Sequence, residues 1–445
     1  MKTIKPFAII VLLACFLPIS REWFKYLEYF FDDEVSSVNE LRFRELTSST
    51  AEVVWSLDYN HSDIIIPSKV LIGMRVHTVT SIRDSAFCAY NNLKSVEIPK
   101  SVTTIGNYVF YGCKNLESIK IPSSVTNIGI GAFLECESLK YIEIPSSVTN
   151  IGNYAFSECK NLQFIKIPSG VTNIGNYVFY GCDNLKHVVI PSSVTSIGEG
   201  AFRLCSRLRQ IEIPSSVTSI GDGAFRLCSK LEQIEIPSSV SSIGDGAFLG
   251  CVGLRQVEIP SSVSSIGDGA FLGCVSLRQV DIPSGLSRIG KGTFKRCKKL
   301  VKVTIPSSVT EIEDDLFVEC DSLKSIEIPL GVKKIGDNAF YGCDELESVK
   351  MPQSVENIGN LAFKNCKKLK NITIPSNART IGKEAFGNCV GLETMEIPSS
   401  VSFIGSSAFF GCENMEVKIH PFSTRYRYFG DDPFNGCKSV THKKH

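Results

Sequence analysis

The sequence lacks an excess of either charge. Its 445 residues include 47 Lys and Arg against 46 Asp and Glu, which leaves a formal net charge of +1. A nearly neutral chain has no global attraction for nucleic acid, for an anionic membrane or for an acidic substrate. The basic tail, residues 441–445, is too short to change this balance. We therefore expect no nucleic-acid partner.

The sequence also lacks the motifs of common catalytic and metal sites. It has no Cys-x-x-Cys, no Gly-x-Ser-x-Gly and no P-loop, and outside the tail its histidines have no metal-ligand spacing. The glycine-rich Gly221-Asp222-Gly223 recurs in register at Gly244 and Gly267, which indicates a repeated turn. Nothing places a pair of carboxylates in a pocket, so a hydrolase is improbable. We expect no enzyme, no cofactor and no metal.

Long apolar runs are missing except at the amino terminus. Lys2 and Lys5 precede an apolar run over residues 7–17, which is shorter than the roughly 20 residues of a membrane span. Residues 1–20 are therefore predicted to be a signal peptide, cleaved near Ser20. A lipobox-like segment that ends at Cys15 makes lipidation of Cys15 the alternative, and a retained signal anchor is a third. The chain is expected to be secreted or on the cell surface, touching a membrane only through this lipid or anchor.

What the sequence has in abundance is a repeat. Proline recurs every 23 residues from Pro99 to Pro421, and columns of Phe and Cys run beside it in the same register. A unit of this size cannot bury its apolar side alone, so successive copies must stack into one continuous core. Residues 67–440 are predicted to form such a solenoid of about fifteen copies, called rungs below. Its core ladder includes Phe110, Cys113, Phe225 and Cys228.

Each rung has a recognisable internal pattern. Leu116-x-x-Ile119-x-Ile121 alternates as a strand with one buried face does, and Pro122 ends it because proline donates no ladder hydrogen bond. Gly106 is expected to allow a turn with positive φ. The Ala/Val-Phe-x-x-Cys segment predicts a single helical turn.

The cysteines are predicted to be free thiols. Stacked rungs place neighbouring cysteine Cβ atoms about 4.8 Å apart, whereas disulfides prefer about 3.5–4.5 Å. The Cys column is therefore expected to consist of buried thiols that act as small apolar side chains.

The pattern L-x-x-I-x-I-P-x-x-V-x-x-I-x-x-x-A-F-x-x-C, over residues 79–440, resembles the BspA-like leucine-rich repeats. This resemblance implies a right-handed solenoid with parallel strands on its concave side and short turns elsewhere. Several proteins of this family are surface adhesins that hold host matrix proteins or other cells. The resemblance thus implies a binding role.

The two ends depart from the repeat, as caps do. Residues 21–66 are predicted to form an amino-terminal cap, with a helix within 21–40 and a strand pair within 41–66. In the first rung Tyr90 holds the cysteine position, and near the other end His420 replaces the isoleucine before proline.

Two outward-facing columns are candidate contact surfaces. Tyr141, Phe164 and His187 fall on successive rungs, and stacked exposed aromatics suit a protein partner or a sugar ring. The alternative is that these side chains merely cover one another.

The second column is acidic: Glu212, Glu235, Glu258 and Asp281. Adjacent members repel by roughly 0.9 kcal/mol in bulk water, which a cation or a basic partner would relieve. Arg209, Arg255 and Arg278 are an alternative source of neutralisation, and duplication of the nearly identical repeats over 191–282 alone explains the column. A second acidic column on a turn has the same origin: Glu199, Asp222, Asp245 and Asp268.

The sequence therefore favours a non-catalytic adhesion protein that presents its strands to a protein or glycan. The alternative is a structural spacer or a self-assembling surface-coat component.

Overall fold

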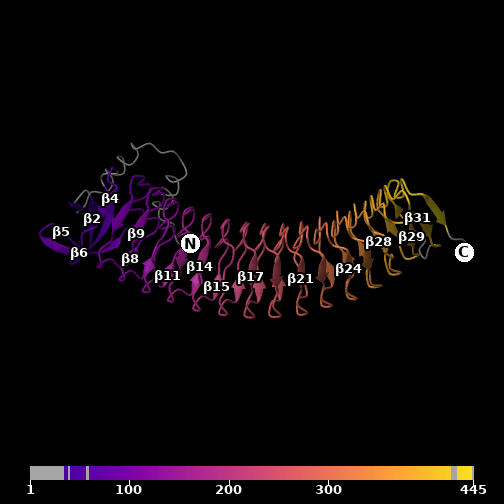
Figure 1. Cartoon of the computed structure of the whole chain (residues 1–445), viewed down its shortest axis with the longest axis horizontal. Helices are drawn as coiled ribbons and strands as arrows, with labels where there is room; N and C mark the ends of the chain where they lie inside the picture. The colour runs from indigo at the N-terminus through magenta and orange to yellow at the C-terminus, as the bar shows by residue number, and fades with distance from the viewer. Residues whose placement is uncertain (1–34, 39–40, 57–59, 422–427, 443–445) are drawn as a thin grey trace.

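The protein is a curved rod of stacked rungs (Figure 1), seen in a computed structural model that describes residues 35–38, 41–56, 60–421 and 428–442. The predicted parallel solenoid is confirmed. Within the described ranges the chain forms no helix, so no helical segment there could cross a bilayer. The predicted signal peptide, Cys15 and Lys443–His445 lie outside these ranges.

Two parallel ladders of strands run along the rod. The first joins the strands on the proline side of most rungs, as in β17, β19 and β21, which pair in register. The second joins strands on the other side of the proline, which have two residues each except for the longer β6 at the start, as in β16, β18 and β20. The first set is β4 (Asp63–Ile65), β7 (Ser95–Glu97), β9 (Ser118–Lys120), β12 (Phe164–Lys166), β14 (His187–Val189), β17 (Gln233–Glu235), β19 (Gln256–Glu258), β21 (Gln279–Asp281), β22 (Lys302–Thr304), β24 (Ser325–Glu327), β26 (Ser348–Lys350), β29 (Thr394–Ile397), β31 (Glu416–Ile419) and β33 (Ser439–His442). The second set is β6 (Arg75–Ile82), β8 (Thr104–Ile105), β10 (Asn127–Ile128), β11 (Asn150–Ile151), β13 (Asn173–Ile174), β15 (Ser196–Ile197), β16 (Ser219–Ile220), β18 (Ser242–Ile243), β20 (Ser265–Ile266), β23 (Glu311–Ile312), β25 (Lys334–Ile335), β27 (Asn357–Ile358), β28 (Thr380–Ile381), β30 (Phe403–Ile404) and β32 (Tyr428–Phe429).

The strands sort side chains into buried and exposed, as their alternation predicts. In β17, Ile234 is buried between the exposed Gln233 and Glu235. We call the outward side of the first set the strand face and that of the second set the short-strand face. The outward side of the turns that follow the second set is called the turn face.

The Ala/Val-Phe-x-x-Cys segment forms consecutive turns, so the predicted helical turn is wrong. The N–H of Cys113 bonds to the carbonyl of Phe110 at 3.1 Å, but the N–H of Phe110 bonds across to Ala132 of the next rung at 2.8 Å. Tyr108 and Gly112 have φ of 54° and 68°. These left-handed residues interrupt the helical path and send alternate N–H groups to the neighbouring rung.

Gly106 does not have a positive φ, which corrects the sequence expectation. It is needed for close packing between rungs. A Cβ at Gly106 would lie 2.6 Å from Oδ1 of Asp84 and 2.8 Å from its backbone nitrogen. Gly221 has the same role, with a would-be Cβ 2.8 Å from the carbonyl carbon of Gly198. Only a glycine lets consecutive rungs approach this closely. Gly221-Asp222-Gly223 is thus part of a turn that recurs on successive rungs.

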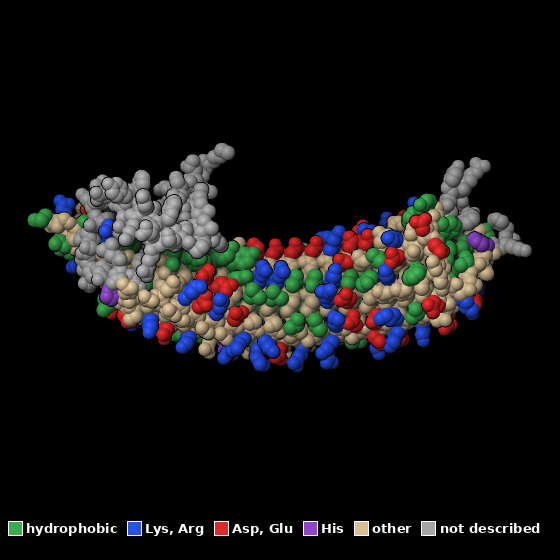
Figure 2. Space-filling model, turned by 90° about the horizontal axis from the view of Figure 1, so that it is seen from above, with side chains coloured by type: hydrophobic (Ala, Val, Ile, Leu, Met, Phe, Trp, Pro, Cys, Tyr) green, Lys and Arg blue, Asp and Glu red, His purple; other side chains and the backbone are tan. Residues whose placement is uncertain are grey.

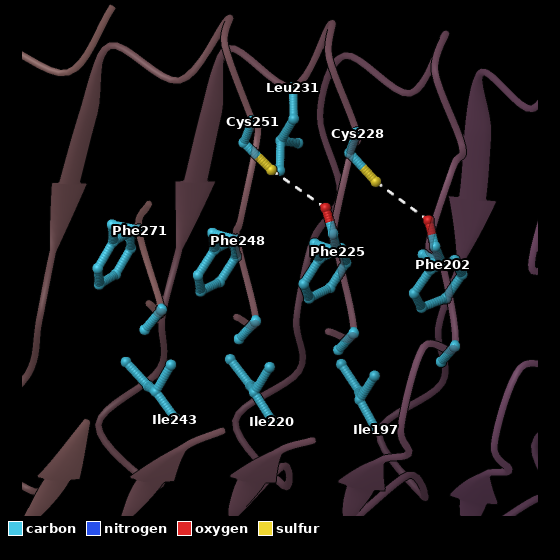
Figure 3. Close-up of a cluster of buried hydrophobic side chains, with 14 of the residues drawn as sticks. Ile197, Phe202, Ile220, Phe225, Cys228, Leu231, Ile243, Phe248, Cys251 and Phe271 are labelled. Atoms are coloured by element: carbon cyan, nitrogen blue, oxygen red, sulfur yellow. Dashed lines mark hydrogen bonds between the residues drawn. The ribbon is translucent and has the colours of Figure 1, made fainter. Parts of the chain in front are cut away.

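A continuous stack of phenylalanine rings forms the centre of the core (Figure 3). From Phe87 to Phe434, neighbouring ring centroids lie 5.1–5.9 Å apart with planes within 16° of parallel. The rings up to Phe409 are fully buried. Each contributes roughly 1.5–3 kcal/mol by burial, but only because a neighbouring rung covers it.

The cysteines form a second buried ladder, and its fourteen members from Cys113 to Cys412 are free thiols, as predicted. Each Sγ is a hydrogen-bond donor to the phenylalanine carbonyl of the preceding rung, as in Cys228 to Phe202 and Cys251 to Phe225, both 3.1 Å (Figure 3). Burial raises the pKa of these thiols, to about 12 at Cys228. They are therefore protonated at neutral pH and unreactive.

The amino-terminal end is covered by additional strands. β2 (Leu41–Thr47) and β3 (Thr50–Ser56) form an antiparallel pair where a strand pair is expected, and β3 continues in parallel onto β6. β1 (Val35–Val38) pairs with β2, and β5 (Lys69–Ile72) pairs with β6. Most of the helix expected within 21–40 lies outside the described residues, and 35–38 form β1. Tyr90 is buried at the cysteine position, as predicted.

At the other end the register slips by one residue, which corrects the assignment of His420. β29 pairs with β31 so that Ile397 lies opposite Ile419. Ile419, which is buried, therefore holds the isoleucine position and His420 the position of proline. The alternation of buried and partly exposed side chains along β31 decides the register, because a shift by one residue would expose the buried side chains. Nε2 of His420 lies 3.1 Å from Glu396.

The phenylalanine stack yields a first prediction. Phe225→Ala should lower the free energy of unfolding by about 3–5 kcal/mol, because the cavity has rungs on both sides that cannot close it. Hydrogen exchange should show faster opening of the adjoining rungs. Gln233→Ala, an exposed change on the same rung, is the control. Equal exchange rates in the two variants would contradict the prediction.

The thiol ladder predicts that the fold weakens at alkaline pH. A thiol of the unfolded chain titrates near about 8.5, whereas the buried thiols hold their protons to higher pH. Stability is thus complete below about pH 8.5 and falls above it, by about 1 kcal/mol per pH unit per thiol. The test measures the free energy of unfolding at neutral and at alkaline pH. Between the two pH values this free energy should fall less in the variant Cys205→Ala/Cys228→Ala/Cys251→Ala than in the natural chain. Both proteins share every Lys and Tyr, so parallel pH profiles would refute the idea.

Candidate binding surfaces

The aromatic column lies on the strand face where the sequence places it. Tyr141 bridges to Phe164, and β12 pairs with β14 so that Phe164 lies opposite His187. Tyr141 is 54% exposed and His187 is exposed, while Phe164 is half-buried between them. Neighbours therefore cover only part of the column, and an aromatic surface remains in contact with solvent.

The acidic column also lies on the strand face. Glu235, Glu258 and Asp281 are directly opposite one another in β17, β19 and β21, and Glu212 is exposed on the preceding rung. Gln279 donates a hydrogen bond to Asp281 at 3.0 Å.

The neighbouring arginines bind elsewhere. Arg209 and Arg255 both reach Glu232, at 3.4 and 3.6 Å. Within the described part of the chain, no ion pair reaches any of the four column carboxylates. Arg209 and Arg255 therefore pair with Glu232 and not with this column, and among the described residues Arg278 forms no ion pair with it either.

The second acidic column has a structural role on the turn face. Oδ1 of Asp222 accepts the backbone N–H of Asp245 at 2.8 Å, and Oδ1 of Asp245 accepts that of Asp268 at 2.7 Å. Oδ1 of Asp268 in turn accepts the N–H of Lys291 at 2.8 Å. Each of the three aspartates therefore satisfies a backbone donor of the next rung, whereas Glu199 accepts the hydroxyl of Tyr177.

The turn face also carries an aromatic group that the sequence reasoning missed. The rings of Tyr154 and Tyr177 stack at 5.1 Å, and Tyr180 meets Tyr177 edge-on at 6.0 Å. The Tyr177 hydroxyl donates a hydrogen bond to Glu199, which raises the pKa of Tyr177 to about 12. The 23-residue spacing of Tyr154 and Tyr177 was the signal for this stack.

A pair of oppositely charged rungs was missed as well. Arg288, Lys291 and Arg296 belong to a rung rich in basic residues, and each reaches an acid of the next rung. The pairs are Arg288–Glu313 at 2.7 Å, Lys291–Asp314 at 2.9 Å and Arg296–Glu319 at 3.1 Å. These basic residues are therefore engaged within the rod and offer no unpaired cationic patch.

Charge on the surface is arranged in stripes. Figure 2 shows acidic side chains in a row along one edge of the middle of the rod and Lys and Arg side chains along the opposite edge. Among the residues that the structure describes, no three His, Cys, Asp or Glu side chains cluster as a metal site would require.

Comparison with known proteins identifies the family. Three overlapping stretches, residues 80–209, 195–324 and 310–441, match the BspA type leucine rich repeat region. The chain belongs to this family. No curated protein matches the chain.

Solved structures of leucine-rich repeat proteins share the fold. A leucine-rich repeat protein of Bacteroides ovatus is 32% identical, with a TM-score of 0.72 over 93% of this chain and 100% of that one. A leucine rich cell surface protein of Faecalibacterium prausnitzii is 34% identical, with a TM-score of 0.57 over 77% and 95%. A leucine-rich repeat protein of Eubacterium ventriosum, 24% identical over 85% and 94% with a TM-score of 0.50, supports the fold alone.

The two acidic columns should respond differently to mutation. Asp245→Ala removes the acceptor of the Asp268 N–H and should cost about 1 kcal/mol of unfolding free energy. Glu258→Ala, on the strand face of the same rung, should change stability by less than about 0.5 kcal/mol, because no contact depends on it. Chemical denaturation of both variants tests this difference, and a larger loss in Glu258→Ala would reverse the assigned roles.

Proposed function

We propose that this BspA-type protein is a non-catalytic adhesion protein whose strand face binds a protein or glycan at the cell surface. The observation that carries the proposal is the aromatic column Tyr141, Phe164 and His187 on the strand face, in which Tyr141 and His187 are exposed to solvent. Aromatic side chains lose little entropy on binding and supply much of the energy of binding sites.

The acidic column extends the proposed contact along the same face. Glu212, Glu235, Glu258 and Asp281 follow the aromatic column on later rungs, without arginine partners among the described residues. A partner with a basic segment would relieve their mutual repulsion and be steered toward the strand face. These rungs therefore favour a protein partner with a basic stretch.

The proposed location is outside the cytoplasm. The expected signal peptide over residues 1–20, or lipidation at Cys15, would export the chain. The Faecalibacterium relative is described as a cell surface protein, which agrees with this proposal. Free thiols are compatible with export here, because burial keeps the thiol ladder protonated and out of reach of oxidants.

The aromatic column can be tested with a double variant. Tyr141→Ala/Phe164→Ala should weaken binding to a partner captured from a panel of matrix proteins and cell-surface glycans by at least about 30-fold, as loss of a hot spot of about 2 kcal/mol implies. Surface plasmon resonance would measure affinity, and circular dichroism would show an unchanged fold.

A matched control uses the other aromatic group. Tyr154→Ala/Tyr180→Ala removes two tyrosines from the turn face and should leave affinity unchanged. The strand-face assignment would be refuted if both double variants bound the partner as tightly as the natural chain.

A structural role in a surface coat is the second candidate, favoured by the apolar tip at the amino-terminal end. The β5–β6 hairpin exposes Leu71, Met74 and Val76, at 56%, 98% and 61%. Large exposed apolar groups of this kind mark contact sites between proteins. Ordered end-to-end assembly in electron micrographs, with no ligand on the strand face, would favour this candidate over adhesion.

A further inference from the structure

A depression of about 270 Å³ opens on the short-strand face in the carboxy-terminal half of the rod. Its walls include Lys334, Asp337, Asn357, Thr380 and Phe403, which come from four successive rungs. The volume lies just below the roughly 300 Å³ at which small-molecule sites begin, and it suits one sugar ring. The depression is on a different face from the aromatic and acidic columns.

The change of side chains along the short-strand face creates this depression. In the middle of the rod the outward column consists of small residues, Ser219, Ser242 and Ser265, paired in register. Further along, the column continues through β25, β27 and β28 to Phe403 in β30. Phe403 lies next to the smaller Thr380 in this column, and its larger ring bounds one end of the depression.

The side chain of Phe403 lines one end of the depression. The ring also stacks on Tyr428 of the next rung, with ring centroids 5.5 Å apart and planes 7° from parallel. Phe403 remains 37% exposed although Tyr428 packs against it. A flat apolar surface held by a second aromatic ring suits the C–H face of a pyranose ring.

The remaining walls supply hydrogen-bonding groups in fixed orientations. Oδ1 of Asn357 accepts the Thr380 hydroxyl at 2.8 Å, so the N–H₂ group is the part of this amide that can donate to a ligand. Asp337 is held by the backbone and side-chain amides of Asn360 at 2.7 and 3.2 Å. The charged groups that line the depression are Asp337 and Lys334, and the ammonium group of Lys334 also lies 3.9 Å from the carboxylate of Asp314 on the preceding rung. The site therefore has no surplus positive charge that would attract an acidic sugar.

We propose that this depression binds a neutral hexopyranose, as a terminal sugar of a glycan. The apolar face of the sugar would pack on Phe403, and its hydroxyls would bond to Asn357, Asp337 and Lys334. The aromatic wall matches the apolar face of such a sugar. The amide, carboxylate and ammonium groups match the hydroxyls at its rim. A uronic or sialic acid would instead bring its carboxylate close to Asp337.

The test uses saturation-transfer NMR and titration of the full chain with the methyl glycosides of galactose, glucose and mannose, and with methyl glucuronide as the acidic comparison. At least one neutral glycoside should bind with a dissociation constant on the order of 1 mM. Phe403→Ala and Asn357→Ala should each weaken binding by about tenfold or more, whereas Phe403→Tyr, which keeps the ring, should retain it.

Two control variants show whether the sugar occupies the depression or another part of the surface. Phe410→Ala removes another exposed phenylalanine that does not line the depression and should leave binding unchanged. Tyr141→Ala/Phe164→Ala should also leave it unchanged, and a loss there would place the sugar on the strand face and overturn the proposal. Hydrogen exchange on each variant verifies that the rungs remain folded.

Three further results would overturn it. One is the absence of saturation transfer from every neutral glycoside up to concentrations on the order of 50 mM. Another is equal affinity of folded Phe403→Ala and the natural chain. The third is tighter binding of the glucuronide than of all neutral glycosides, which would show that Lys334 selects an anion.

Discussion

Register between stacked rungs is the constraint on which the rest of the structure depends. Hydrogen bonds cross to the neighbours in both directions: the N–H of Thr126 reaches back to Thr103 at 3.0 Å, and the N–H of Phe110 reaches forward to Ala132 at 2.8 Å. Core rings and thiols are likewise buried only by adjacent rungs. A displacement of one rung would break backbone bonds and expose core surface together, so the interior tolerates little change and variation is confined to outward positions.

The same constraint explains why identical repeats acquire different roles on different faces. Asp245 and Glu258 belong to one duplicated unit and repeat with the same period. Asp245 is fixed by the backbone, because its carboxylate accepts the N–H of Asp268, whereas Glu258 has only other acids opposite it in the ladder. Duplication accounts for both columns, and they differ in whether the carboxylate holds the backbone of the next rung.

Much of this arrangement could be predicted from the sequence, because a strict period reveals which side chains share an environment. The phenylalanine and cysteine ladders and the position of Tyr141 follow from spacing alone. Backbone conformation does not: Leu204 and Leu227 have φ of 64° and 61°, although nothing in a leucine signals a left-handed turn. The pairing of Arg209 with Glu232 depends on side-chain direction, and the depression beside Phe403 depends on residues from several rungs at once. Such features arise between copies, where a repeat pattern carries little information.

A stiff rod also changes what weak sites can achieve. Tyr141 and Phe403 are roughly eleven rungs apart, or about 50 Å at ~4.8 Å per rung. If the strand face holds a glycoprotein and the depression holds one of its sugars, the first contact makes the second intramolecular. A flexible linker would spread the second site over many positions. The stacked core instead fixes the distance between the two sites, which raises the effective concentration of the second site for a partner of matching length. Millimolar affinity for a single sugar is then sufficient for adhesion, because the rigidity of the core and not the strength of either site keeps the two contacts in place.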